Sequence, residues 1–126
     1  MTDLKRYIVC GGRDYSDRSF VYLNLNKMLE YDWNFVLVHG ACRGADMLAA
    51  GWGEAAGVIL EPHPANWNEL GKAAGMIRNR EMLETGVDGV VAFPGSVGTA
   101  GMVNMARRAH VLIWDLRGEN RKFSER

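Results

Sequence analysis

The sequence has few of the features that mark disordered, collagen-like or strongly basic proteins. Among its 126 residues there are only three prolines, and 15 lysines and arginines balance 15 aspartates and glutamates. The small number of prolines and the ordinary apolar content exclude a disordered or collagen-like chain. The zero net charge removes the broad basic field that nonspecific nucleic-acid binding requires, so nucleic acid is not an expected partner.

Cysteines are also scarce, and long apolar runs are missing. Cys10 and Cys42 form no CxxC pair and have no partners at zinc spacing, which predicts neither a disulfide framework nor a metal site. No apolar run approaches the roughly 20 residues of a membrane span, and residues 1–6 lack the apolar stretch of a signal peptide. Because free thiols are typical of a reducing compartment, we expect a cytoplasmic protein without a membrane partner.

The chain does contain a regular alternation of short apolar segments and amphipathic segments. Strands are expected at 7–10, 35–39, 58–61, 89–93 and 111–114. Helices are expected after an Asp17 cap and over 46–56, 73–83 and 99–108. Strands that are apolar on both faces favour a parallel sheet covered by helices. We therefore predict one Rossmann-like α/β domain over 1–116, a doubly wound parallel sheet of about five strands with helices on both faces, and a charged C-terminal tail over 117–126.

Glycine-rich loops follow three of the expected strands. They are Gly11-Gly12-Arg13-Asp14, the segment from His39-Gly40 to Arg43-Gly44-Ala45-Asp46, and Pro94-Gly95-Ser96-Val97-Gly98-Thr99. Because the carboxyl ends of parallel strands meet at one edge of a sheet, the three loops are expected to line one crevice. Glycine lets the backbone approach a ligand, and the amino end of a helix favours an anion, which together point to phosphate. Tight strand-to-helix turns also need glycine, and this is the structural alternative for each loop.

Two familiar nucleotide motifs are missing from these loops. Gly11-Gly12 does not extend to GxGxxG, and no GxxxxGK[ST] occurs anywhere in the chain. Their absence argues against a dinucleotide dehydrogenase and against a P-loop NTPase. No cofactor is therefore expected.

A few side chains near the loops are candidates for ligand contact. Arginine offers paired donors to phosphate, and Arg78 is favoured over Arg80 because residues two apart on a helix point about 200° apart. We expect Arg80 to be exposed or ion-paired, and Arg78→Ala to weaken ligand binding with little loss of fold stability. Asp46 either binds a ribose hydroxyl, orients an arginine or caps a helix, with capping preferred. Trp67 either stacks on a base or covers the core.

Taken in order, these segments resemble one protein family. The set consists of Gly11-Gly12-Arg13-Asp14, His39-Gly40 with Arg43-Gly44-Ala45-Asp46, Trp67, Ala74-Gly75 with Arg78-Asn79-Arg80-Glu81-Met82, and Pro94-Gly95 with Gly98-Thr99. It resembles the SLOG superfamily, and most of all its YspA-like, cpYpsA-related branch, from about residue 7 to residue 109. The resemblance implies a Rossmann-like fold that binds a nucleotide or nucleotide-derived ligand, and it implies a homodimer or larger homo-oligomer. Related families are the Lonely Guy phosphoribohydrolases and DNA-processing protein A.

The resemblance leaves three functions open. The leading one is binding of a nucleotide or nucleotide-derived ligand, as a sensor or processing module. The enzyme alternative is a nucleotide N-glycosidase or phosphoribohydrolase, but the glutamate that this signature has shortly after PGGxGT is absent, since Thr99 is followed by Ala100-Gly101-Met102. Catalytic residues stay unassigned, with Arg78, Glu81 and Asp14 as candidates, and single-stranded DNA binding ranks last. The expected ligand or phosphate contacts are Gly11, Gly12, Arg13, Asp14, Gly40, Arg43, Gly44, Asp46, Arg78, Gly95, Ser96, Gly98 and Thr99.

Overall fold

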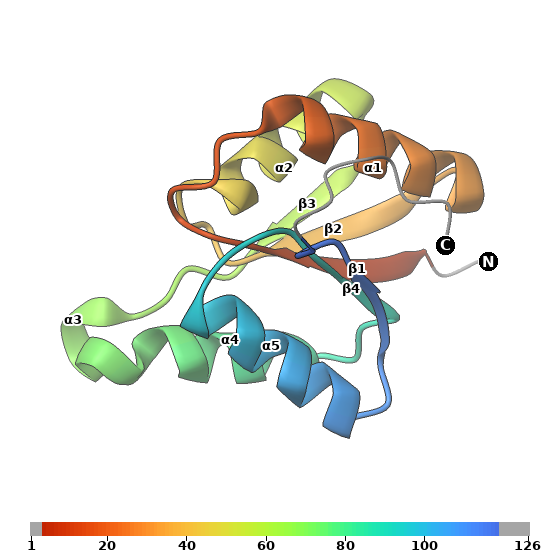
Figure 1. The fold of residues 1–126 in the computed structure, drawn as a ribbon. Coiled ribbons are helices and arrows are strands. Elements are labelled where there is room, and N and C mark those ends of the chain that lie inside the picture. Colours follow the sequence, from red (N-terminus) through yellow and green to blue (C-terminus); the bar gives the residue numbers. More distant parts are fainter. Residues whose placement is uncertain (1–3, 119–126) are drawn as a thin grey trace.

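A computed structural model of the chain describes residues 4–118, and these residues form three layers with the sheet in the middle (Figure 1). In chain order the elements are β1 (Lys5–Cys10), α1 (Arg18–Asp32), β2 (Phe35–His39), α2 (Ala45–Ala56), β3 (Ile59–Pro62), α3 (Trp67–Leu70), the 3-10 turn η1 (Gly71–Ala73), α4 (Ala74–Glu84), β4 (Gly89–Ala92), α5 (Val97–Arg108) and β5 (Leu112–Asp115). Helices α1 and α2 lie on one side of the sheet, and α4 and α5 lie on the other. The predicted Rossmann-like α/β fold is confirmed.

The sheet has five parallel strands in the order β3-β2-β1-β4-β5. β1 lies in the centre, where Ile8 pairs with Val38 of β2 on one side and with Val90 of β4 on the other. The strand order therefore reverses between β1 and β4, because the chain first builds outward to β3 and then returns. Ligands of open α/β sheets bind beyond the carboxyl ends of the strands at such a switch point.

Each face of the sheet has its own hydrophobic core because successive side chains of a strand point to opposite faces. Tyr7 and Val9 of β1 join the core under α1 and α2, which also contains Leu25. Ile8 and Cys10 join the core under α4 and α5, which also contains Met102. Continuous apolar strands are what a sheet covered on both faces requires.

The predicted elements are all present; the strand at 35–39 has the predicted boundaries, and the other boundaries differ by at most two residues. Asp17 caps α1 as expected, since its carboxylate accepts a hydrogen bond from the Phe20 backbone N–H. Gly57 ends α2 with a left-handed conformation, at a φ of 78°. One helix was not predicted: α3 is a single turn capped by the Asn66 side chain, in a segment that was expected to be loop. A turn this short has too few residues to show a helical apolar period.

The described residues end shortly after the last strand. Of the tail expected over 117–126, only Arg117 and Gly118 are described, and the Arg117 guanidinium pairs with the Asp115 carboxylate at 2.8 Å. The rest of the tail and residues 1–3 lie outside the described residues. Between residues 4 and 118, no helix is both long and apolar enough to cross a membrane.

Candidate functional site

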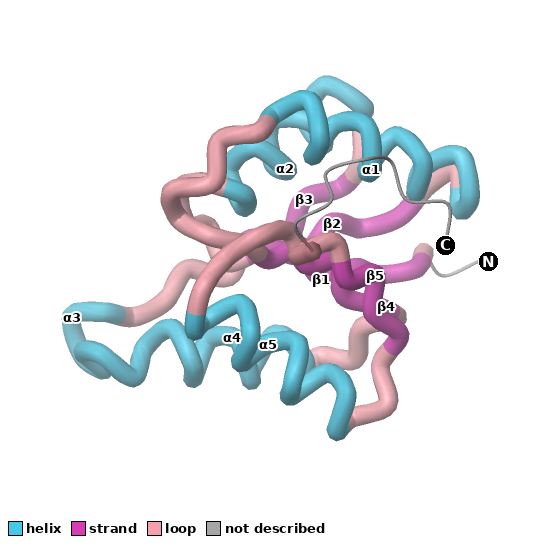
Figure 2. Tube along the Cα trace, in the orientation of Figure 1, coloured by secondary structure: helices cyan, strands magenta, loops and turns pink. Residues whose placement is uncertain are grey.

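The glycine-rich loops meet in one cleft at the carboxyl ends of the strands. Figure 2 shows the loops that follow β1, β3 and β4 on the same side of the sheet. The Gly12 N–H donates to the Pro94 carbonyl at 2.8 Å, and the Ala45 N–H donates to the Gly12 carbonyl at 3.1 Å. Through these two bonds the β1–α1 loop holds both the β4–α5 loop and the start of α2. Beside them lies a cleft of about 740 Å³, a volume typical of a small-molecule site.

Most residues expected to contact a ligand line this cleft. They are Gly11, Gly12, Arg13, Asp14, Arg43, Asp46, Arg78, Gly95, Ser96, Gly98 and Thr99. Gly40 and Gly44 do not line it. Both lie behind the wall, where they allow other parts of the protein to come close.

Four of the loop glycines are needed for contacts inside the protein, the first being Gly11, where an added Cβ would lie 2.5 Å from the Ala45 Cβ. A Cβ on Gly44 would clash with the Gly12 carbonyl and lie 2.5 Å from the Arg13 carbonyl. A Cβ on Gly95 would clash with the Thr99 hydroxyl and lie 2.8 Å from the Gly12 nitrogen. A Cβ on Gly40 would clash with the guanidinium of Arg78. Part of the glycine pattern therefore records how tightly the loops are packed, which was the structural alternative for it.

Arg78 projects from α4 beneath the β2–α2 loop and is 8% exposed. Its NH1 donates to the carbonyls of Gly40 at 2.5 Å and His63 at 3.3 Å, and its Nε donates to the Asn79 side chain at 2.8 Å. NH2 lies 3.6 Å from the Cys42 sulfur. A guanidinium has five N–H groups, so one of them has no acceptor among residues 4–118. Arg78 thus ties α4 to two loops, and it also lines the cleft.

Asp46 lies in the first turn of α2 and is buried. It does not cap its own helix, whose N-cap is Gly44 without a side-chain bond; this corrects the preferred interpretation. Its Oδ2 instead accepts the backbone N–H groups of Gly40 at 2.8 Å and Cys42 at 3.4 Å, which holds the β2–α2 loop. Burial raises the pKa of this carboxyl to about 6, against the opposite effect of the two N–H donors and of Arg78.

The raised pKa makes a pH dependence of stability measurable. In the unfolded chain the carboxyl titrates near 4, so between about pH 4 and pH 6 the folded state binds more protons and loses stability as the pH rises. Asp46→Asn removes this titration. The difference in free energy of unfolding, variant minus wild type, should therefore rise by roughly 2 to 3 kcal/mol as the pH is raised from 4 to 7. Urea unfolding of both proteins at several pH values measures the difference, and a constant difference would contradict the burial of an ionising carboxyl.

The cleft carries more positive than negative side chains. Its cations are Arg13, Arg43, Lys72 and Arg78, and its acids are Asp14 and Asp46. Asp14 is strongly exposed and pairs with Arg43 at 3.2 Å, a contact that solvent screens. Asp46 is partly neutralised near pH 6. The local excess of positive charge favours an anionic ligand although the chain as a whole is neutral.

The amino end of α5 forms another wall. The helix begins at Val97, its N-cap Ser96 makes no side-chain bond to it, and its first turn contains no acidic side chain. The first N–H groups of any helix lack intrahelical partners, and here they lie in a stretch that lines the cleft. Thr99 is buried at the base of this turn, with its hydroxyl beside Gly95.

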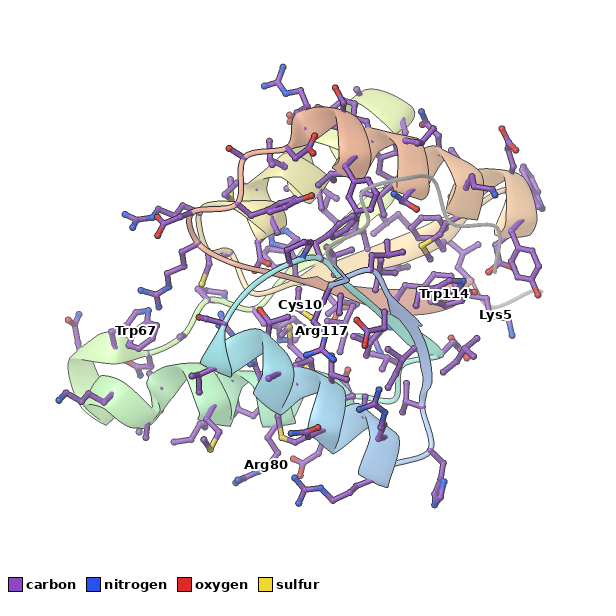
Figure 3. All side chains as sticks on the ribbon, viewed as in Figure 1. Lys5, Cys10, Trp67, Arg80, Trp114 and Arg117 are labelled. Atoms are coloured by element: carbon purple, nitrogen blue, oxygen red, sulfur yellow. The ribbon has the colours of Figure 1, made fainter. Side chains whose placement is uncertain are left out.

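Glu81 and Lys72 lie where the sequence did not place them, whereas Arg80 lies as expected. Glu81, a candidate catalytic residue, is exposed on α4 outside the cleft. Arg80 is exposed as expected and points away from the sheet (Figure 3). Lys72 lines the cleft but was missed, and its only signal is a lysine beside a glycine in the turn before a helix. Within residues 4–118, no three His, Cys, Asp or Glu side chains gather as a metal site.

Sequence comparison connects this cleft with known proteins. The profile of the YspA, cpYpsA-related SLOG family matches residues 5–69, just over half of the chain, including the first two glycine-rich loops and Trp67. The chain belongs to this family. A relative of this SLOG protein is the Gene 61 protein of Mycobacterium phage D29, which is 36% identical over 118 residues that cover 87% of this chain and 94% of the phage protein.

Three solved structures share the SLOG fold with this chain. DNA processing protein A (DprA) from Streptococcus pneumoniae has a TM-score of 0.76 at 16% identity over 92% of this chain, which spans about half (51%) of the DprA chain. The protein TM1055 has a TM-score of 0.70 at 20% identity, covering 87% of this chain and 72% of its own. The Moco carrier protein from Chlamydomonas reinhardtii has a TM-score of 0.63 at 18% identity, covering 91% and 76%.

Proposed function

We propose that the cleft binds a small nucleotide or nucleotide-derived molecule, with its phosphate at the amino end of α5. One observation carries the proposal: the uncapped first turn of α5 and an excess of cations line the same cleft. A phosphate there accepts hydrogen bonds from helix N–H groups and neutralises the local positive charge. Arg78 supplies a further donor through its remaining N–H.

The family and the structural neighbours support binding but leave the ligand open. One neighbour is named as a Moco carrier and another as a DNA processing protein, so small molecules and DNA both occur among the names of proteins with this fold. A small ligand fits this chain better than DNA does. The net charge of the chain is zero, and the local excess of cationic side chains lies in the cleft. Nucleic-acid binding normally needs a broader basic surface.

Gly98 and Gly101 offer a matched test of the phosphate position. Both are in α5 and have no other atoms within 4 Å of an added Cβ, but only Gly98 lines the cleft. Alanine at either position is expected to leave the fold intact or stabilise the helix slightly. Gly98→Ala fills the space where the phosphate approaches the backbone, so we expect it to weaken binding of AMP about tenfold, or about 1.4 kcal/mol, while Gly101→Ala does not change it.

Calorimetric titration with AMP and with inorganic phosphate measures these affinities. Equal binding of AMP by the wild type and Gly98→Ala would place the phosphate elsewhere. Absence of binding by the wild type would contradict the nucleotide proposal. If the protein does not bind AMP but shifts the mobility of short oligonucleotides in a salt-sensitive way, the ligand is single-stranded DNA and not a small molecule.

Cleavage of the ligand is a second candidate function, and Asp46 is the observation in its favour. Breaking an N-glycosidic bond builds positive charge on the ribose, which a carboxylate has to stabilise, or the carboxylate activates the attacking water. Asp46 lines the cleft, has a pKa of about 6, and uses only Oδ2 in its bonds to the β2–α2 loop. Chromatography of AMP incubated with the protein separates the two functions, because only turnover releases free adenine.

A further inference from the structure

Trp67 is the aromatic residue of the cleft whose exposure is not explained by packing in a hydrophobic core. It is 43% exposed and belongs to neither hydrophobic core. Tyr15, the other aromatic side chain of the cleft, packs on Phe93 at 6.1 Å between ring centres and is therefore part of the fold. An indole exposes a large apolar surface to water when it has no partner. Of the two roles open at Trp67, covering the core is therefore wrong.

The position of the Trp67 ring is fixed by its neighbours. It stands at the start of α3, whose N-cap Asn66 accepts the Glu69 backbone N–H through its side chain. A Cβ built on Gly75 of α4 would lie 3.3 Å from the indole Cη2. Figure 3 shows Trp67 on the side of α3 that faces the loops of the opposite half of the molecule. The glycine at 75 thus lets the ring edge lie against α4 while the ring borders the cleft.

One face of the ring is already occupied by a planar group. The Arg13 guanidinium lies over it at 4.9 Å from the ring centre. Arg13 belongs to the β1–α1 loop and Trp67 to α3, so the pair joins the two halves of the cleft. A guanidinium over an exposed indole is a weak, displaceable contact. Its position marks where a flat ligand group fits.

We propose that Trp67 is a stacking platform for the aromatic base of the ligand, with the base in the place that the Arg13 guanidinium occupies. The inference rests on the proposed function, since it needs a phosphate-bearing ligand in the same cleft. Stacking of a base on an aromatic side chain is stronger than an exposed cation–π contact, so the exchange favours the base. It also frees the charge of Arg13 inside a site that binds an anion. The ligand class is therefore a mononucleotide or a molecule built on one, and not a sugar phosphate alone.

The experiment compares a ligand with a base and one without. AMP and ribose 5-phosphate are titrated into the wild type, Trp67→Leu, Trp67→Phe and the control Trp33→Leu, whose indole is exposed on the α1–β2 turn outside the cleft. We expect AMP to bind the wild type more tightly than ribose 5-phosphate does. Trp67→Leu should lower AMP affinity roughly tenfold to a hundredfold and leave ribose 5-phosphate unchanged. Trp67→Phe should retain part of the affinity, and AMP should quench tryptophan fluorescence in the wild type more than in Trp67→Phe.

The outcomes separate this inference from the proposed function. If AMP and ribose 5-phosphate bind the wild type equally, or if Trp67→Leu binds AMP as the wild type does, the platform is wrong while phosphate binding stands. If Trp67→Leu lowers the affinity for AMP and for ribose 5-phosphate equally, Trp67 only maintains the shape of the cleft, and the stacking proposal is wrong. If neither ligand binds the wild type, both proposals fail.

Discussion

Replacing Gly44 with alanine is expected to destabilise the protein by about 3 kcal/mol or more, a large fraction of the 5 to 15 kcal/mol of a typical domain. Gly44 has a φ of 82° and a ψ of −132°, a conformation that side chains disfavour strongly. A Cβ there would also clash with the Gly12 carbonyl and lie 2.5 Å from the Arg13 carbonyl. Backbone atoms cannot rotate away as a side chain does, so the β1–α1 and β2–α2 loops would have to separate.

Gly57 is the matched control for this substitution. It has a similar φ of 78°, with a ψ of 20°, and nothing lies within 4 Å of an added Cβ. Gly57→Ala should therefore cost only the left-handed backbone conformation, about 1 kcal/mol. Urea unfolding of the two variants gives the comparison. If both variants lose the same free energy of unfolding, the loops tolerate a methyl group at Gly44, and the inference that they pack tightly there is wrong.

Arg78→Ala is expected to lower the free energy of unfolding by about 3 kcal/mol and to weaken AMP binding as well. The substitution removes charge-assisted donors from the carbonyls of Gly40 and His63, which lie beneath the cleft. It also empties the space of a side chain that is 8% exposed. The expectation from sequence, weaker binding with little loss of stability, is replaced in its second part, because the structure shows that Arg78 also holds two loops.

Arg80→Ala is the control, because it also removes one arginine from α4. Arg80 is two residues along the same helix but exposed, so its loss should change the free energy of unfolding by less than about 0.5 kcal/mol and leave AMP affinity unchanged. Thermal unfolding and calorimetric titration of both variants provide the two readouts. A stability loss in Arg80→Ala as large as in Arg78→Ala would mean that the wrong face of α4 has been assigned to the sheet.

The fold was readable from the sequence because its signals are local and repeated. The first four strands are short apolar runs ended by glycine or proline, and each longer helix has an apolar period, so the alternation favours a parallel sheet with helices on both faces. The carboxyl-end rule then brought all three glycine-rich loops to one cleft, with Gly12, Arg43 and Gly95 on its wall. The ordered motifs also pointed to the family that the profile of residues 5–69 shows.

The tasks of individual side chains were decided by tertiary structure. Gly40 and Gly44 carry the same local signal as Gly12, yet they lie behind the cleft, because only the packing of the loops determines which glycine lines the cleft and which is covered by other parts of the protein. Whether Trp67 is core or exposed depends on α3 and on Gly75, which are beyond the reach of a local pattern. A sequence reports which residue types are available along the chain, but hydrogen-bond partners and solvent exposure arise from contacts between segments that are far apart in it, and those contacts exist only in the folded protein.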